Sequence, residues 1–210
     1  MIVTFGGQEF ILHHSGALYW PSEKILVVSD LHLEKGSHFA LRGFFLPPYD
    51  SSHTLSLLTN VMRETGCARL MLLGDSFHDD KAYARLGAKE KRVFDSLCSY
   101  NPIWIRGNHD KDFVPQGFLA TVAHIESGIT FRHEASSDTD FEISGHYHPK
   151  AQITPRLSRP CFVTDGTRMI MPAFGAYTGG LFIDSAPILS VLSGGRQVYA
   201  LGKERVYAVG

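Results

Sequence analysis

Cysteine is scarce in this chain of 210 residues: Cys67, Cys98 and Cys161 are far apart, odd in number and form no CxxC pair. This spacing argues against a disulfide framework and against a cysteine-based zinc site. Because disulfides are mostly confined to oxidising compartments, we expect the protein to work in a reducing cytoplasm.

Long hydrophobic runs are also missing. No stretch approaches the roughly 18 apolar residues that a membrane-spanning helix needs. The first ten residues, MIVTFGGQEF, lack the basic start and apolar run of a signal peptide. We therefore expect neither a membrane segment nor an export signal.

No excess of one charge sign is present, since 20 Lys and Arg nearly balance 21 Asp and Glu. Overall charge thus neither indicates nor excludes nucleic acid as a partner. Affinity for a polyanion would have to come from a local feature, and bound metal ions are the strongest candidate. A hydrophobic content of 44% and this length are expected for a single globular domain over residues 1–210.

The first half of the chain alternates between apolar runs and amphipathic segments. Apolar runs at 25–29, 69–73 and 102–105 predict buried strands. Segments 50–65 and 88–99 between them predict helices. Strands that alternate with helices favour an α/β fold with a parallel sheet.

Local signals define the ends and faces of these elements. Gly6-Gly7 predicts a hairpin between residues 2–5 and 9–13. Asp50 and Ser51 can cap the first helix, and Gly66 can end it. The predicted buried faces consist of Leu55, Leu58, Val61 and Met62 in the first helix and of Val93, Leu97 and Cys98 in the second.

The pattern changes after residue 118 to short segments separated by turns, at 129–132, 141–144, 150–154 and 168–171. This spacing predicts an antiparallel, β-rich half that packs a second sheet against the first. A short helix near 186–192 and a strand pair near 196–200 and 204–209 complete the chain.

Histidine is unusually frequent, and polar residues gather where the buried strands end. The chain has 11 histidines, and histidine is the commonest metal ligand and general acid or base. The three buried strands lead into Asp30-Leu31-His32, Gly74-Asp75 and Gly107-Asn108-His109-Asp110. Because ligands bind at the carboxyl ends of parallel strands, these side chains should converge. Later segments add His133 and Gly145-His146-Tyr147-His148.

Each motif taken alone has an ordinary explanation, since glycine, aspartate and asparagine are common in turns. In combination, their order and placement favour a site for two divalent metals. Imidazole and carboxylate suit Mn, Fe or Zn. Two such ions can hold a phosphate and activate water for in-line attack.

The whole series resembles the signature of calcineurin-like metallophosphoesterases, and the resemblance spans roughly residues 25–150. It implies a four-layer α/β/β/α sandwich of two mixed sheets flanked by helices. It also implies two metal ions that share Asp75. One ion would be held by Asp30, His32, Asp75 and His148, and the other by Asp75, Asn108, His133 and His146.

The resemblance further assigns catalytic roles to two neighbouring residues. His109 would lie outside the ligand set, contact the phosphate and protonate the leaving oxygen. Asp110 would orient His109.

Stretches such as SDLHLEKGSHFA, LGDSFHD, SGHYHPKA and MPAFGAYTGGL are also similar to the ligase-associated metallophosphoesterases of bacterial DNA-repair gene clusters. That similarity implies a manganese-dependent endonuclease for single-stranded DNA. It also implies a functional link to a DNA ligase and a helicase.

His78 follows Asp75 by three residues, and we predict that it contacts a DNA phosphate. We interpret the other histidines, His13, His14, His38, His53 and His124, as surface or packing residues. Lys35 and Arg42 could meet a phosphate backbone but are more simply solvated charges. The stretch 175–180 is expected to be a tight turn that could line the cleft.

Two alternatives stay open at this point. The first is a phosphatase, pyrophosphatase or cyclic nucleotide phosphodiesterase of the same superfamily that acts on a small molecule. The second is a non-catalytic binding module on the same fold. The second alternative is disfavoured because all seven ligand positions and His109 are present.

Overall fold

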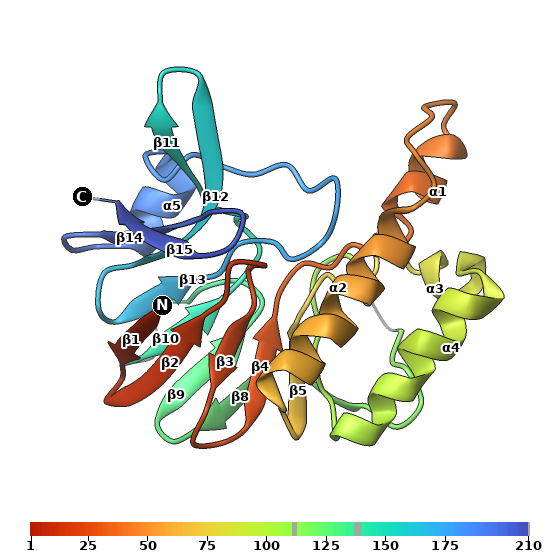
Figure 1. Cartoon of the computed structure of the whole chain (residues 1–210), viewed down its shortest axis with the longest axis horizontal. Helices are drawn as coiled ribbons and strands as arrows, with labels where there is room; N and C mark the ends of the chain where they lie inside the picture. The colour runs from red at the N-terminus through yellow and green to blue at the C-terminus, as the bar shows by residue number, and fades with distance from the viewer. Residues whose placement is uncertain (111–112, 137–139, 210) are drawn as a thin grey trace.

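The predicted βαβ half forms one seven-stranded sheet in the computed structural model, which describes residues 1–110, 113–136 and 140–209 (Figure 1). In spatial order its strands are β1 (Ile2–Phe5), β2 (Gln8–Leu12), β3 (Leu18–Trp20), β4 (Ile25–Val28), β5 (Arg69–Leu73), β6 (Ile103–Ile105) and β7 (Leu119–Thr121). The strands β4 to β7 run parallel, which confirms the predicted parallel sheet. The strands β1 to β4 form an antiparallel meander that begins with the predicted hairpin.

The helices α1 (Lys35–Ala40) and α2 (Asp50–Thr65) connect β4 to β5. All four apolar residues predicted for one face of α2 are buried, and Gly66 ends the helix with a positive φ of 62°. The predicted capping is wrong, because neither Asp50 nor Ser51 caps α2 with its side chain. Asp50 Oδ2 instead accepts a hydrogen bond of 2.8 Å from the Gly36 backbone, and Ser51 Oγ accepts one of 2.7 Å from the Glu34 backbone. Both residues therefore tie α2 to the start of α1.

Two short helices and a 3₁₀ turn connect β5 to β6: α3 (Ala82–Arg85), α4 (Ala88–Ser96) and η1 (Leu97–Tyr100). Phe94 and Leu97 face the core, whereas Cys98 is exposed, so the prediction for Cys98 is wrong. The chain tightens to a 3₁₀ turn after Ser96, and its three residues per turn rotate Cys98 away from the face that α4 buries.

The second sheet has the spatial order β15, β14, β12, β13, β10, β9, β8, and β11 pairs with β12. The strand bounds are β8 (Ala123–Glu126), β9 (Ile129–Arg132), β10 (Glu142–Ser144), β11 (Lys150–Thr154), β12 (Leu157–Thr164), β13 (Arg168–Ile170), β14 (Gln197–Leu201) and β15 (Val206–Val209). The sheet is mixed rather than antiparallel as predicted, because β10 runs parallel to both β9 and β13. The sequence of a short segment between turns does not show whether the strand runs parallel or antiparallel to its neighbours. Here the chain crosses over between these strands, which makes them parallel.

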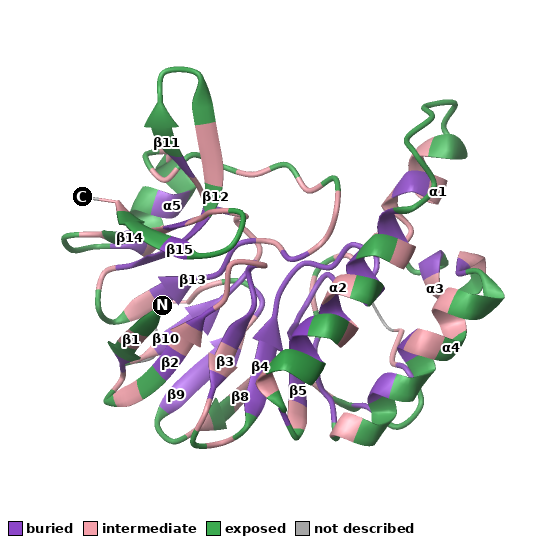
Figure 2. Cartoon of the chain, in the orientation of Figure 1, coloured by how far each residue is buried: buried purple, intermediate pink, exposed green. Residues whose placement is uncertain are grey.

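Three apolar layers hold the elements together. Residues of both sheets, among them Trp20, Val27, Phe131 and Phe162, form a core between the sheets. A second core lies between the first sheet and the helices α2 and α4. A third joins the second sheet to α5 (Ala186–Val191). The buried strands at the centre and the helices outside confirm the four-layer α/β/β/α sandwich (Figure 2).

Two segments project from the side of the molecule toward which the β4 arrow points (Figure 1). One is residues 35–49, which comprise α1 and the loop to α2, and we call it the spur. The other is residues 149–164, which comprise β11 and β12, and we call it the hairpin. Within the described ranges, no helix is long and apolar enough to cross a bilayer.

Candidate metal centre

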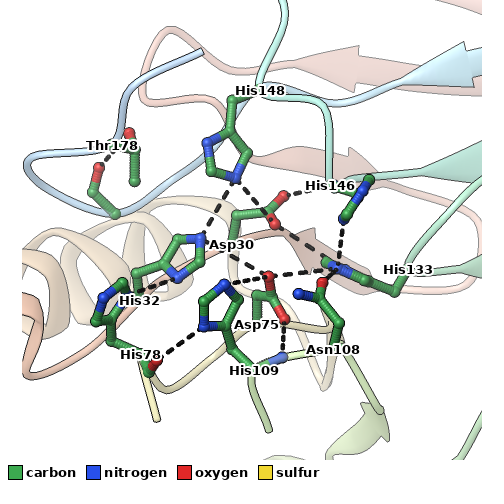
Figure 3. A network of polar contacts seen from close by, with 12 residues as sticks. Asp30, His32, Asp75, His78, Asn108, His109, His133, His146, His148 and Thr178 are labelled. Atoms are coloured by element: carbon green, nitrogen blue, oxygen red, sulfur yellow. Dashed lines mark hydrogen bonds and ion pairs between the residues drawn. The ribbon is translucent and has the colours of Figure 1, made fainter. Parts of the chain in front are cut away.

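The polar residues that follow five strands converge at one place between the two sheets (Figure 3). Those after β4, β5 and β6 come from the first sheet, and those after β9 and β10 come from the second. Three groups have all their ligand atoms within 4.8 Å of one another: Asp30 with His32 and His148, Asp75 with His133 and His146, and His32 with His78 and His109. The first two groups are the groupings that the family resemblance implied for the two ions.

The backbone at this place is strained. Five of the seven predicted ligands have a positive φ: Asp30 (54°), His32 (44°), Asp75 (49°), His146 (70°) and His148 (46°). A left-handed conformation is uncommon for residues other than glycine and persists only where surrounding structure enforces it. Such clustering is typical of a functional site rather than of ordinary turns.

Two glycines of the motifs are required because of close packing. A Cβ atom at Gly107 would lie 2.2 Å from both the backbone nitrogen and Oδ1 of Asp75. A Cβ atom at Gly145 would lie 1.7 Å from Ser29 Oγ and 2.6 Å from Asp30 Oδ2. No side chain fits at these distances, so glycine is what brings the loops after β6 and β10 against the two carboxylates.

Asp30 is fully buried, and its two oxygens differ in their surroundings. Oδ2 accepts hydrogen bonds from the Ser29 hydroxyl and from the His146 backbone at 3.0 Å. Oδ1 has no hydrogen-bond partner in the described part of the chain, and His148 Nε2 lies 3.1 Å from it. A buried oxygen left in this state fits a metal ligand, because an unpaired buried carboxylate oxygen would otherwise be costly.

Asp75 belongs to the group of His133 and His146 and also approaches the group of Asp30, His32 and His148. Its Oδ1 accepts a hydrogen bond of 2.8 Å from the His109 backbone. Its Oδ2 lies 3.4 Å from His133 Nε2 and 3.9 Å from His32 Nε2, one nitrogen from each group. This placement fits a carboxylate shared by two ions.

His133 is held with one nitrogen toward the site. Its Nδ1 donates a hydrogen bond of 2.8 Å to the Leu73 carbonyl, which leaves Nε2 facing Asp75. Asn108 Oδ1 and His146 Nδ1 lie 3.0 Å and 3.1 Å from Nε2. A backbone acceptor behind the imidazole is the usual arrangement for a metal-ligating histidine, because it fixes the tautomer and the ring.

The charges of the site are strongly coupled. Burial lowers the pKa of His32 to about 3, which keeps its imidazole neutral as a ligand requires. Burial also lowers the pKa of His133, but the hydrogen bond to Asp75 and the charges of Asp30 and Asp75 outweigh it and raise the value to about 9. Burial opposes ionisation of Asp75 as well, yet His133 and the backbone of His109 lower the pKa of this carboxyl to about 2. Without metal, a proton on His133 therefore offsets part of the buried negative charge.

His109 lies at the edge of the ligand set, with Nε2 3.9 Å from Asp75 Oδ2. Its Nδ1 donates a hydrogen bond of 2.8 Å to the His78 carbonyl, and the rings of His78 and His109 stack at 5.1 Å. Asp110 does not supply this hydrogen bond. The Asp110 carboxylate is buried and accepts hydrogen bonds from the backbones of Phe77 and Gly107 at 3.1 Å and 3.0 Å. It therefore acts on His109 indirectly, because it joins the loop after β5 to the loop after β6.

Two residues lie beside the site although the sequence suggested a surface or packing histidine, His38, and a solvated charge, Lys35. The His38 ring packs edge-on against His78 at 4.6 Å, and its Nδ1 donates a hydrogen bond of 2.7 Å to Asp79. Lys35 lines the cleft with the ligands. Both residues lie on α1, which begins at Lys35 shortly after the Asp30 motif, and the sequence signal for this helix is the stretch LEKGSHFA. By contrast, His13 and His124 pair with Glu64 and Glu126 away from the cleft.

The site opens to the surface through a cleft of about 360 Å³. Five of the seven predicted ligands line it, namely His32, Asp75, Asn108, His146 and His148. The rest of the lining is Lys35, His78, His109, Tyr147, Gly179, Gly180 and Leu181. The stretch 175–180 thus contributes to the wall, as the sequence had left open. A Cβ atom at Gly180 would lie 2.1 Å from the His148 carbonyl, so this wall packs directly on a ligand loop.

Comparison with known proteins agrees with this geometry. The family model described as calcineurin-like phosphoesterase matches residues 23–163, about two thirds of the chain. The chain belongs to this family. It is therefore a phosphoesterase, and the residues of the site fit the pair of metal ions on which the family depends.

Among solved structures, a nuclease named MPE from Pseudomonas putida is similar over 100% of this chain and 99% of its own, with 28% identity and a TM-score of 0.77. A phosphoesterase from E. coli, Yfce, is similar over 88% of this chain and 97% of its own, with 14% identity and a TM-score of 0.49. No curated protein sequence matches the chain.

Proposed function

We propose that this phosphoesterase is a manganese-dependent endonuclease that cleaves single-stranded DNA. The observation that carries the proposal is the placement of His109 beside a complete set of seven ligand side chains at an open cleft. The full-length similarity to a protein named a nuclease supports the choice of a nucleic acid as substrate. Manganese is the proposed metal, and zinc or iron suits the same ligands.

The seven ligands would hold the two ions in the groups that the structure brings together, with Asp75 shared. When bound, the ions would supply Lewis-acid activation of the phosphate and of the attacking water. The protein prepares this chemistry by holding each carboxylate with one oxygen in backbone hydrogen bonds and the other toward the cleft.

His109 is the proposed general acid. Because its Nδ1 donates to the His78 carbonyl, Nε2 is the nitrogen that faces the cleft and can protonate a departing oxygen. An alkoxide of DNA needs this proton, whereas a nitrophenolate leaves without it.

His78 is the proposed phosphate contact. Burial, together with the charges of Lys35, His109 and His38, lowers its pKa to about 4, so it acts as a neutral hydrogen-bond donor. It lies between His109 and the spur, at the side of the cleft where a long substrate would leave the metal centre.

A single strand suits the site better than a duplex. A flexible strand can lower one phosphate into the cleft, whereas a duplex must first be deformed. Sequence preference is expected to be weak, since this mode of binding reads the backbone.

The test compares substrates and metals on the purified protein. Single-stranded DNA, duplex DNA, nucleotides, cyclic nucleotides, a nucleotide diphosphate conjugate and bis(p-nitrophenyl) phosphate are each assayed with Mn²⁺, Zn²⁺, Fe²⁺ and Mg²⁺. We expect the highest kcat/KM among natural substrates for single-stranded DNA with Mn²⁺. A higher value for a nucleotide or conjugate would instead establish the small-molecule alternative. Equal rates on duplex and single strand would refute the strand preference.

A functional link to a DNA ligase and a helicase follows from the resemblance, and a cytoplasmic location follows from the number and spacing of the cysteines; both stay predictions. Co-purification with an affinity-tagged chain tests for a physical link.

A further inference from the structure

The loop of the spur exposes large apolar side chains to solvent. Exposed fractions are 74% for Leu41, 66% for Phe44, 87% for Phe45, 36% for Leu46 and 69% for Tyr49. Three of these five are aromatic. A contiguous exposed cluster of this kind marks an interaction site.

The charges of the spur and the hairpin identify the kind of partner. Together these segments carry five of the chain's 20 Lys and Arg, namely Lys35, Arg42, Lys150, Arg156 and Arg159. They carry none of its 21 Asp and Glu. In a chain with a net charge of −1, both projections are therefore locally basic, which is complementary to a polyanion.

Both projections are continuous with the metal centre. In the spur, the Phe39 ring stacks on His78 at 5.9 Å, and His78 in turn stacks on His109. At the base of the hairpin, Lys150 Nζ lies 4.9 Å from the centre of the Phe182 ring, and Lys150 follows the ligand loop that ends at His148. The spur and the hairpin stand apart on one side of the molecule (Figure 1). A strand that leaves the cleft would thus meet Lys35 at the base of the spur or Lys150 at the base of the hairpin.

The base of the spur is firmly held, so the exposed rings are presented from a fixed support. Asp79 accepts two hydrogen bonds from Arg85, at 2.9 Å and 2.6 Å, and one from His38. Arg85 also donates to Ser37 Oγ at 2.9 Å. With the contacts that Asp50 and Ser51 make to the start of α1, these bonds connect the spur to the loop that carries His78.

We propose that Phe44, Phe45 and Tyr49 of the spur form a base-stacking platform for nucleotides next to the scissile phosphate, with Lys150 at the base of the hairpin holding the backbone on the other side. This inference rests on the proposed function and deepens it. Exposed aromatic rings beside cations are how proteins hold single strands without reading sequence. A duplex keeps its bases stacked inside, so the platform would favour single strands.

The apolar loop could also cover a second copy of the chain. Nucleic acid is the better occupant, because a hydrophobic dimer contact has no need for two segments that carry five cations and no carboxylate and that lead into a phosphoesterase cleft. The oligomeric state therefore serves as one outcome of the test.

The first measurement compares kcat/KM for an oligo(dT) of about 20 nucleotides and for bis(p-nitrophenyl) phosphate, both with Mn²⁺. The test variant is Phe44→Ala/Phe45→Ala. The matched control is Ile125→Ala, which removes an apolar side chain that is 70% exposed on β8. We expect the double variant to lose roughly tenfold on the oligonucleotide, given the usual contribution of base–aromatic stacking, and less than twofold on the small ester. The control should match the wild type on both.

The second measurement is the affinity for fluorescent oligo(dT) by anisotropy in Ca²⁺, together with sedimentation velocity of each variant. Loss of affinity in the double variant, with unchanged sedimentation, supports the platform even if the wild type cleaves another ester faster than DNA. This measurement therefore tests the platform separately from the proposed nuclease activity.

Three results would overturn the platform. One is equal loss on the oligonucleotide and the small ester, which would make the spur a structural support. Another is unchanged cleavage and binding of oligo(dT). The last is a wild-type dimer that the double variant dissociates, which would assign the loop to self-association.

Discussion

The metal centre and the spur lie in contact but differ in how they are built. At the metal centre, Asp30 and Asp75 are buried, five ligands have strained backbone, and almost every polar atom has a fixed partner. In the loop of the spur, all residues from Leu41 to Tyr49 are exposed, and only the base is tied down. The difference fits the division of labour that we propose, in which rigid, buried groups would perform the chemistry and exposed rings and cations would select a long substrate.

The largest expected effect is at Asp75, in the metal centre. Replacing Asp75 with Ala removes the oxygen that approaches both ligand groups. We expect activity on DNA and on bis(p-nitrophenyl) phosphate to fall at least about 10³-fold, beyond the roughly 10–100-fold typical when a side chain that only supports a ligand is lost. Kinetics and metal analysis of the purified variant measure this. Retained activity on either substrate would refute the shared ligand.

Replacing His109 should reduce the activity on the two substrates by different factors. We expect His109→Ala to lose roughly 10²–10⁴-fold on DNA, where an alkoxide departs, but only a few-fold on the nitrophenyl ester. The rate as a function of leaving-group pKa, over a series of aryl esters, measures the difference. A uniform loss across the series would show that His109 positions the phosphate rather than protonating the leaving group.

Gly107 tests whether close packing sets the geometry of the centre. A methyl group there would meet Asp75 at 2.2 Å, whereas one at Gly195 would meet nothing within 4 Å. We expect Gly107→Ala to lose about 100-fold in kcat on both substrates, the usual effect of a displacement near 1 Å, and Gly195→Ala to lose none. Thermal unfolding of both variants shows whether the protein remains folded. Full activity in Gly107→Ala would contradict the packing argument.

The affinity for metal should depend on pH through His133. Its pKa is raised to about 9 in the metal-free protein, so a bound metal must displace a proton below that pH. We expect the apparent affinity to rise up to about tenfold per pH unit from 7 to 9 and then level off, as measured by calorimetry in several buffers. The stabilising charge of the imidazolium is present below the unfolded pKa of about 6.5 and is lost as the pH rises through 9. A flat affinity over this range would show that His133 is already neutral.

The smallest expected effect concerns Lys150, a cation of the hairpin. We expect Lys150→Ala to weaken binding of oligo(dT) several-fold and to reduce the slope of log K against log salt by about 0.7, given about 0.7 per phosphate contact on a single strand. Arg63→Ala/Lys89→Ala, with cations on α2 and α4, is the control and should leave the slope unchanged. Phe44→Ala/Phe45→Ala should weaken binding at constant slope. An unchanged slope in the hairpin variant would remove the hairpin from the binding path.

Much of the centre was predictable because buried strands and the polar residues after them are local features. Strands 25–29 and 69–73 are apolar on both faces, which marks them as central and parallel, so Asp30 and Asp75 had to meet at one edge. The role of Asp110 was predictable only in part: its carboxylate binds two backbone amides of neighbouring loops. The hydrogen-bond partner of a short side chain depends on how the loops pack. The spacing of residues in the sequence does not show this packing.

From the sequence, Lys35 and Arg42 of the spur were interpreted as solvated charges and His38 as a surface or packing residue. Nothing in the sequence around Lys35 or His38 distinguishes residues beside a functional site from those of an ordinary loop. The parallel direction of β9, β10 and β13 was equally hidden, since a short strand reads the same in either direction.

The sequence by itself determined the family, the ligand set and the alternation of buried strands and helices, because these depend on residue type and short-range order. Only the tertiary structure decided which oxygen of each carboxylate is held by backbone hydrogen bonds, which carbonyl fixes His109, and that the helix before an exposed aromatic loop packs on His78. Those features arise where segments distant in the chain come together, and the packing of the two sheets is what brings them there.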